Sequence, residues 1–141
     1  MNKEFHYTIY IRSTREQVWR AITTPEFTAQ YWGQSLVSDW KQGSKWEMIR
    51  NSDKSLNVVG TVVESIPSER LALSWAEIAK PDDESLALFE IEQADQLVRL
   101  KITHTKLSDY MAGRISYGWP WVLSGLKSFV ESGGLDAKPA A

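Results

Sequence analysis

His104 is the polar residue of this sequence with the most potential for chemistry. In a strand over residues 97–105, His104 would share one face with the apolar residues Val98 and Leu100. An imidazole in that position can hydrogen-bond at the rim of a core, orient a carbonyl or hydroxyl group of a ligand, or act as a general base. A general base needs a second polar group nearby. The sequence offers three without selecting among them: Glu90, Arg50 and Asp39.

Several classes of catalytic and metal site are excluded by residue type alone. With two histidines and no cysteine, one chain cannot build a three-histidine zinc site, a cysteine zinc site or a thiol nucleophile. The motifs GxGxxG, GxxxxGK, HExxH and GxSxG are absent from the sequence. The acidic run at 82–84 follows Pro81 in a turn and lacks the alternating donors and the glycine of a calcium loop. We therefore expect no catalytic residue, no metal and no cofactor.

Composition and charge narrow the class of protein. The 141 residues suit one ordinary domain, and 43% of them are hydrophobic and 24% charged, which is typical of globular proteins. A net charge of -2, with Lys and Arg scattered, provides no basic surface for nucleic acid. No apolar run approaches the roughly 18 residues of a membrane span, and the N-terminus does not resemble a secretory signal. We expect a cytoplasmic protein with no nucleic-acid partner and no membrane span.

The spacing of hydrophobic residues predicts the elements that would position these groups. Residues 5–11 alternate as a first strand; Ser13 or Thr14 then caps a helix, and Pro25 begins a second short helix that Gly33 ends. Turn-forming residues separate six further runs that we predict as strands: 35–40, 45–50, 56–66, 70–76, 85–92 and 96–105. Their short connections indicate an antiparallel meander, because parallel neighbours need long crossovers.

A long amphipathic helix closes the sequence. Its apolar face consists of residues spaced by three and four: Ile115, Trp119, Val122, Leu126 and Phe129. Pro120 either lies in the first turn of this helix or kinks a helix that begins near residue 111. The predicted fold class is α+β, with the long helix covering the buried face of a curved antiparallel sheet and two short helices after the first strand. We expect one domain over residues 1–132 and a flexible tail over 133–141.

A series of short motifs extends over nearly the whole chain, from about residue 5 to residue 133. The motifs are Thr24-Pro25-Glu26 with Tyr31-Trp32, Gly43 with Trp46 and Met48, residues 60–67, residues 70–75, Thr103-His104-Thr105, Gly118-Trp119-Pro120 with Leu123 and Leu126-Lys127, and Glu131-Ser132-Gly133. Their order and spacing resemble the START-like superfamily, also called SRPBCC or birch-pollen-allergen-like. The resemblance is greatest to its branch of homologues of the activator of the heat shock protein 90 ATPase. The second glycine often found beside Gly43 is Gln42 here.

The resemblance implies a helix-grip fold with a hydrophobic cavity between the sheet and the last helix, and it places Trp32 near the mouth. Pockets favour aromatic walls, and the seven tryptophans either fill the core or line such a cavity. Strand and helix periodicity turn the other candidates inward. The candidate ligand-binding residues are Trp32, Trp46, Met48, Trp75, Phe89, His104, Trp119 and Val122.

Three functions are compatible with this resemblance, because the superfamily performs many. The first is a binding domain, without catalysis, for a small apolar or aromatic ligand. The second is regulation of the heat shock protein 90 chaperone, a stress-response role in which the partner is a protein. The third is a cyclase-like or hydrolase-like enzyme that uses His104 in the cavity. In each case we expect a monomer or a weak dimer.

Overall fold

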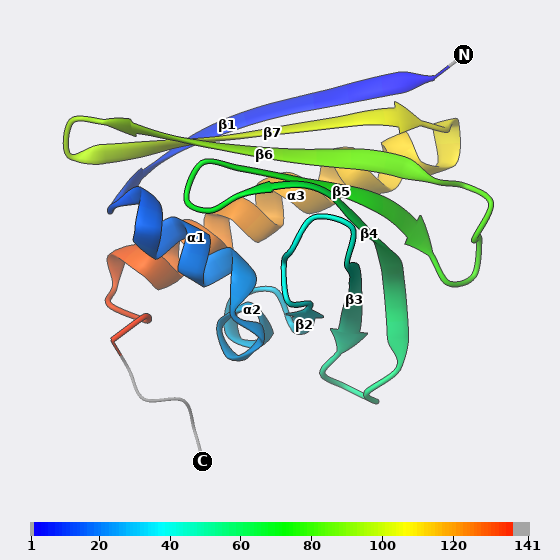
Figure 1. Ribbon diagram of the computed structural model, residues 1–141, viewed down its shortest axis with the longest axis horizontal. Coiled ribbons are helices and arrows are strands. Elements are labelled where there is room, and N and C mark those ends of the chain that lie inside the picture. The colour runs from blue at the N-terminus through cyan, green and yellow to red at the C-terminus, as the bar shows by residue number, and fades with distance from the viewer. Residues whose placement is uncertain (1, 137–141) are drawn as a thin grey trace.

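The computed structural model describes residues 2–136, which form one curved antiparallel sheet of seven strands and three helices (Figure 1). The strands are ordered β1-β7-β6-β5-β4-β3-β2 across the sheet. The elements are β1 (Lys3–Arg12), α1 (Arg15–Thr23), α2 (Pro25–Tyr31), β2 (Gln34–Val37), β3 (Lys45–Arg50), β4 (Leu56–Ile66), β5 (Arg70–Glu77), β6 (Ser85–Ala94), β7 (Leu97–Leu107) and α3 (Asp109–Glu131). The predicted fold class is therefore confirmed, and the arrangement is that of a helix grip.

Alternation along the strands determines which side chains reach the core. On β7, Val98, Leu100, Ile102 and His104 are all fully buried, as the period of two predicts. The register places His104 opposite Ala87 of β6, so the two strands share one apolar face. The sheet thus presents a continuous inner surface to α3.

The two short helices begin where the capping residues predict. The Thr14 side chain accepts the backbone N–H of Gln17 at 3.3 Å, so Thr14 rather than Ser13 caps α1. Pro25 occupies the first turn of α2, where its missing N–H costs nothing. Gly33 follows with a φ of 77°, a conformation that glycine adopts without strain.

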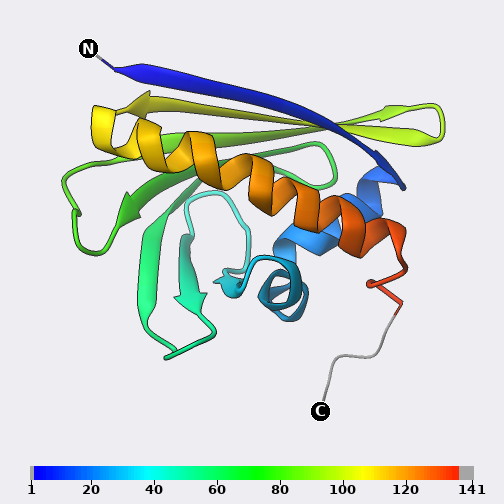
Figure 2. The ribbon, with the colours of Figure 1, turned by 180° about the vertical axis from the view of Figure 1, so that it is seen from behind.

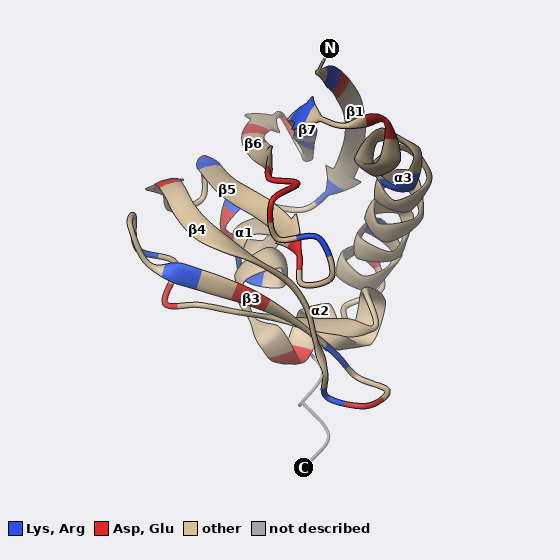
Figure 3. Cartoon of the chain, turned by 90° about the vertical axis from the view of Figure 1, so that its right-hand side faces the viewer, with Lys and Arg blue, Asp and Glu red and all other residues tan. Residues whose placement is uncertain are grey.

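Helix α3 begins well before Pro120, so the proline does not lie in its first turn. The Ser108 side chain caps it by accepting the Met111 N–H at 3.1 Å, and the helix continues to Glu131 with Pro120 in its interior. Of the two placements left open by the sequence, the one with an interior Pro120 is observed. The sheet curves around one side of this helix (Figures 2 and 3).

The strand boundaries lie within two residues of those that the sequence predicts, except at the end of β2. The strand expected over residues 35–40 ends at Val37, since Trp40 has a φ of 61° and its indole N–H donates to the Thr23 carbonyl at 2.9 Å. Of the expected tail, residues 133–136 are described, and Leu135 is buried against the core. Residues 137–141 lie outside the described part. None of the helices described over residues 2–136 is long and apolar enough to cross a membrane.

Candidate functional site

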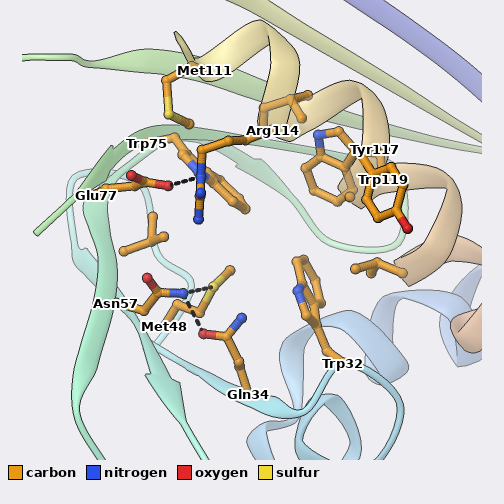
Figure 4. Close-up of a pocket in the computed structure, with 14 residues that line it drawn as sticks. Trp32, Gln34, Met48, Asn57, Trp75, Glu77, Met111, Arg114, Tyr117 and Trp119 are labelled. Carbon is orange, nitrogen blue, oxygen red and sulfur yellow. Dashed lines mark hydrogen bonds and ion pairs between the residues drawn. The ribbon is translucent and has the colours of Figure 1, made fainter. Parts of the chain in front are cut away.

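A pocket of about 410 Å³ lies between the N-terminal half of α3 and the strands β3, β4 and β5 (Figure 4). Helix α3 packs most closely on β1, and its C-terminal half is also held by α1 and α2. Its N-terminal half faces the other end of the curved sheet, where side chains line the intervening space. Tyr117, 83% exposed, marks the solvent side of the pocket.

The apolar wall of the pocket is largely aromatic and sulfur-containing. Its members are Trp32, Met48, Val58, Trp75, Met111, Ile115, Trp119 and Val122. Trp119 stands at the centre of this wall, because its ring lies 5.6 Å from that of Trp32 and 5.5 Å from that of Trp75. Three indole rings therefore form one aromatic surface, from Trp32 directly after α2 and from β5 and α3. The Trp119 ring is inclined at 65° to that of Trp32 and at 53° to that of Trp75, so the surface is concave rather than flat.

Polar side chains gather at one end of the pocket, where Glu77 of β5 meets Arg114 of α3. The Arg114 Nε donates to Glu77 Oε2 at 2.7 Å, and the Tyr110 hydroxyl donates to Oε1 at 2.8 Å. That bond to a carboxylate raises the pKa of the Tyr110 hydroxyl above its usual value. Glu77 is only 12% exposed whereas Arg114 is 57% exposed, so the carboxylate is fixed while the guanidinium reaches solvent.

A second polar pair lies across from Arg114. The Asn57 amide donates to Gln34 Oε1 at 2.7 Å, and Asn57 Oδ1 accepts from Arg50 at 2.8 Å. Figure 4 shows this pair and Arg114 on facing sides of the pocket. The pocket thus has an apolar aromatic wall and a polar end built from two separate hydrogen-bonded groups.

His104 lies behind the pocket wall and is completely buried. The Trp119 indole N–H donates to His104 Nδ1 at 3.1 Å, and His104 Nε2 lies 2.7 Å from Ser85 Oγ. An indole N–H can only donate, so Nδ1 carries the lone pair and the ring proton is on Nε2, which donates to Ser85. Ser85 in turn donates to the Trp75 carbonyl at 3.3 Å. Burial lowers the His104 pKa to about 4, so the ring is neutral near pH 7.

The partners considered for His104 in the sequence are located elsewhere. Glu90 faces the other side of β6 and pairs with Arg70 at 3.0 Å. Arg50 donates to Asn57, which lines the pocket, and Asp39 accepts the Lys41 N–H at 2.9 Å in the loop after β2. His104 is bonded instead by Ser85 and Trp119, and this pattern is that of a core histidine.

The eight candidate residues fall into two layers. Trp32, Met48, Trp75, Trp119 and Val122 line the pocket. The other three candidates, Trp46, Phe89 and His104, form a fully buried second layer. The layers are in contact, because the Trp46 ring lies 5.1 Å from Trp75 and the Phe89 ring lies 5.5 Å from Trp119. Periodicity for seven of them, and the family resemblance for Trp32, lead to one region of the fold without distinguishing the layer that lines the pocket from the one behind it.

Sequence reasoning did not identify the polar end of the pocket. Glu77 and Arg114 are 37 positions apart, and Gln34 and Asn57 are 23 apart, so no local spacing links either pair. One signal was available: Glu77 directly follows the strand predicted over residues 70–76, and in the structure it is the last residue of β5. Across residues 2–136, no three His, Asp or Glu side chains converge closely enough to hold a metal ion.

Comparison with known proteins gives one family match and several similar folds. A model of the family described as Activator of Hsp90 ATPase homolog 1-like protein matches residues 12–131. No curated protein matches the chain. Among solved structures, CalU16 from Micromonospora echinospora has a TM-score of 0.76 at 20% identity, over 96% of this chain and 80% of that one.

Two further structures have names that relate to the family. The Aha1 dimer from Colwellia psychrerythraea has a TM-score of 0.75 at 20% identity, over 92% of this chain and 96% of that one. An HSP90 activator from Plasmodium falciparum has a TM-score of 0.76 at 20% identity, over 90% of this chain and 95% of that one. At these identities the likeness shows the fold alone.

Proposed function

The chain belongs to the Activator of Hsp90 ATPase homolog 1-like family, and from this premise we propose that it is a binding domain for a small, mostly apolar ligand. The observation that carries the proposal is the pocket of about 410 Å³ with three tryptophan rings in its wall. Its volume is within the range of about 300–1,000 Å³ that small-molecule sites occupy. An apolar wall with a few polar groups at one end is the usual composition of such a site.

The wall of the pocket is well ordered before any ligand enters. Trp119 is fixed by its hydrogen bond to His104 and by ring contacts with Trp32, Trp75 and Phe89. A side chain that is already immobile loses little conformational entropy on binding, so more of the contact energy contributes to affinity. Preorganisation of this kind supports binding at a defined site.

The state of His104 supports binding rather than turnover. A general base works best when its pKa lies near the working pH, whereas burial lowers the His104 pKa to about 4. Both ring nitrogens are already engaged, with Trp119 and Ser85. A substrate in the pocket would meet the indole of Trp119 before it met the imidazole.

A ligand panel tests the proposal directly. Lipids, sterols, flavonoids and aromatic polyketides would be screened by thermal shift and by tryptophan fluorescence. A ligand that binds only the folded state raises the unfolding midpoint by mass action. Trp32, Trp75 and Trp119 line the pocket, so occupancy should also change the emission.

Two matched Val→Phe substitutions on β4 locate the binding. Val58 is 4% exposed and lines the pocket, whereas Val63 is 47% exposed and is not among the lining residues. Val58→Phe fills part of the pocket, so we expect it to weaken a hit by about tenfold or more, while Val63→Phe leaves affinity unchanged. If both variants bind like the wild type, the ligand is elsewhere. If no compound of the panel binds the wild type, the small-ligand proposal fails and a protein partner becomes the better hypothesis.

A further inference from the structure

We infer that the ligand of this pocket is an aromatic or apolar acid whose carboxylate binds Arg114 while its apolar part lies against the tryptophan wall. The inference rests on the proposed binding function and adds the chemical class of the ligand. It follows from an imbalance between hydrogen-bond donors and acceptors at the polar end of the pocket.

The acceptors at the polar end already have donors. Glu77 Oε1 and Oε2 accept from Tyr110 and Arg114. Asn57 Oδ1 accepts from Arg50, and Gln34 Oε1 accepts from Asn57. Each of these oxygens thus has at least one donor already, so a ligand that only donates hydrogen bonds would satisfy no unpaired group of the protein.

Several donors at the same place remain available. Arg114 uses its Nε on Glu77, and within the described part of the chain its Nη1 and Nη2 groups have no hydrogen-bond partner. The same holds for the Gln34 Nε2 group and the indole N–H of Trp32, which also line the pocket. Figure 4 shows the guanidinium of Arg114 extending from α3 into the space between Glu77 and the Asn57–Gln34 pair.

The geometry of Arg114 favours a carboxylate over other acceptors. With Nε held by Glu77, the two Nη groups form a planar fork that matches the two oxygens of a carboxylate. The guanidinium also lies over the Tyr110 ring, 5.6 Å from its centroid, which further fixes its plane. The charge of Glu77 offsets part of the attraction, and the 57% exposure of Arg114 screens it, so the expected preference is moderate.

Three probes with one ring system and different head groups test the inference. Naphthoate, naphthamide and naphthylmethylamine would be titrated at about pH 7, where the acid is ionised and the amine protonated. Affinity would be measured by tryptophan fluorescence and confirmed by calorimetry. We expect naphthoate to bind about fivefold more tightly than naphthamide, and naphthylmethylamine to bind most weakly.

Variants of the ion pair separate recognition by Arg114 from a general charge effect. Arg114→Gln should remove the preference for naphthoate, but it also leaves Glu77 without its cation. The double variant Glu77→Gln/Arg114→Gln keeps the net charge of the wild type and should still show no preference. Arg99→Gln is the matched control, because Arg99 pairs with Glu92 on the exposed side of β7 and β6. Its binding should equal that of the wild type, and thermal unfolding would verify that each variant folds.

The possible results separate the two proposals. Loss of the acid preference in both Arg114 variants, with Arg99→Gln unchanged, supports the inference. Equal binding of all three probes, or a preference that persists in the double variant, overturns it and leaves the pocket as a binding site of another selectivity. If no probe binds and Val58→Phe has no effect on any panel compound, both this inference and the binding function fail.

Discussion

The burial of His104 makes the stability of the fold depend on pH in a calculable way. Burial lowers the pKa of this side chain from 6.5 to about 4, and the unfolded chain restores the usual value. As the pH falls below about 6.5, the unfolded state takes up a proton that the folded state cannot, so stability declines until the pH passes about 4. Because the pKa of His104 is lower in the folded state than in the unfolded state, its contribution to the free energy of unfolding is complete above about pH 6.5 and is lost as the pH falls.

The size of this effect follows from the two pKa values. Between about pH 7.5 and pH 4.5, linkage gives a loss of about 2.5 kcal/mol from this one histidine. The free energy of unfolding of an ordinary domain is about 5–15 kcal/mol, so a change of this size is readily measured.

His104→Gln isolates the contribution of this side chain. At about pH 7.5 the variant should be less stable by about 2 kcal/mol, since it loses bonds with Trp119 and Ser85. As the pH falls to about 4.5, the wild type alone loses about 2.5 kcal/mol, so the difference should close and the variant should become as stable as the wild type or slightly more stable. Urea unfolding followed by tryptophan fluorescence at a series of pH values gives both curves. Carboxyl groups titrate in both proteins and cancel in the difference.

His6 offers a control substitution of the same type at an exposed position, where the ring bonds to Glu4. At about pH 7.5, His6→Gln should change the free energy of unfolding by less than about 0.5 kcal/mol. A gap between wild type and His104→Gln that stays constant with pH would refute the reasoning, since it would mean that the folded state protonates His104 as easily as the unfolded state does. The Nε2–H tautomer can be checked independently from the nitrogen chemical shifts of the ring.

Two backbone positions and one cap give further predictions, all measurable by urea unfolding. Gly60→Ala should destabilise the fold by about 3 kcal/mol or more, because the added Cβ would lie 1.8 Å from the Ser74 carbonyl oxygen. Gly113→Ala is its control: nothing lies within 4 Å of the new Cβ on α3, so we expect a gain of about 0.5–1 kcal/mol. Ser108→Ala should lose about 1 kcal/mol with the bond that caps α3 at the Met111 N–H.

The strands and the core could be predicted from the sequence because their signals are local. A period of two on β7 and a spacing of three and four on α3 identify buried faces without any knowledge of partners. The early start of α3 was harder to predict, since Pro120 normally disfavours a helix interior, and the cap at Ser108 lies 12 residues before it. Local rules describe the cost of a proline but not the tertiary packing that outweighs it.

The contacts of His104 show where local reasoning stops. Glu90 could have been rejected as its partner, because alternation on β6 turns Phe89 and Ile91 inward and Glu90 outward. Ser85 could not have been chosen, since its place beside His104 depends on the register between β6 and β7. Register arises from long-range pairing, and a shift by one residue would exchange the two faces of the strand.

Trp119 connects the core and the pocket, and this explains why a buried histidine lies so close to a binding wall. Its indole N–H points away from the pocket and must find an acceptor in an apolar interior, where an unpaired donor would be costly. His104 supplies that acceptor only while Nδ1 is unprotonated, and the lowered pKa keeps it so. The imidazole therefore fixes the orientation of the ring that a ligand would contact, without contacting the ligand itself. A polar residue placed one layer behind an aromatic wall can serve recognition by holding the wall in one position.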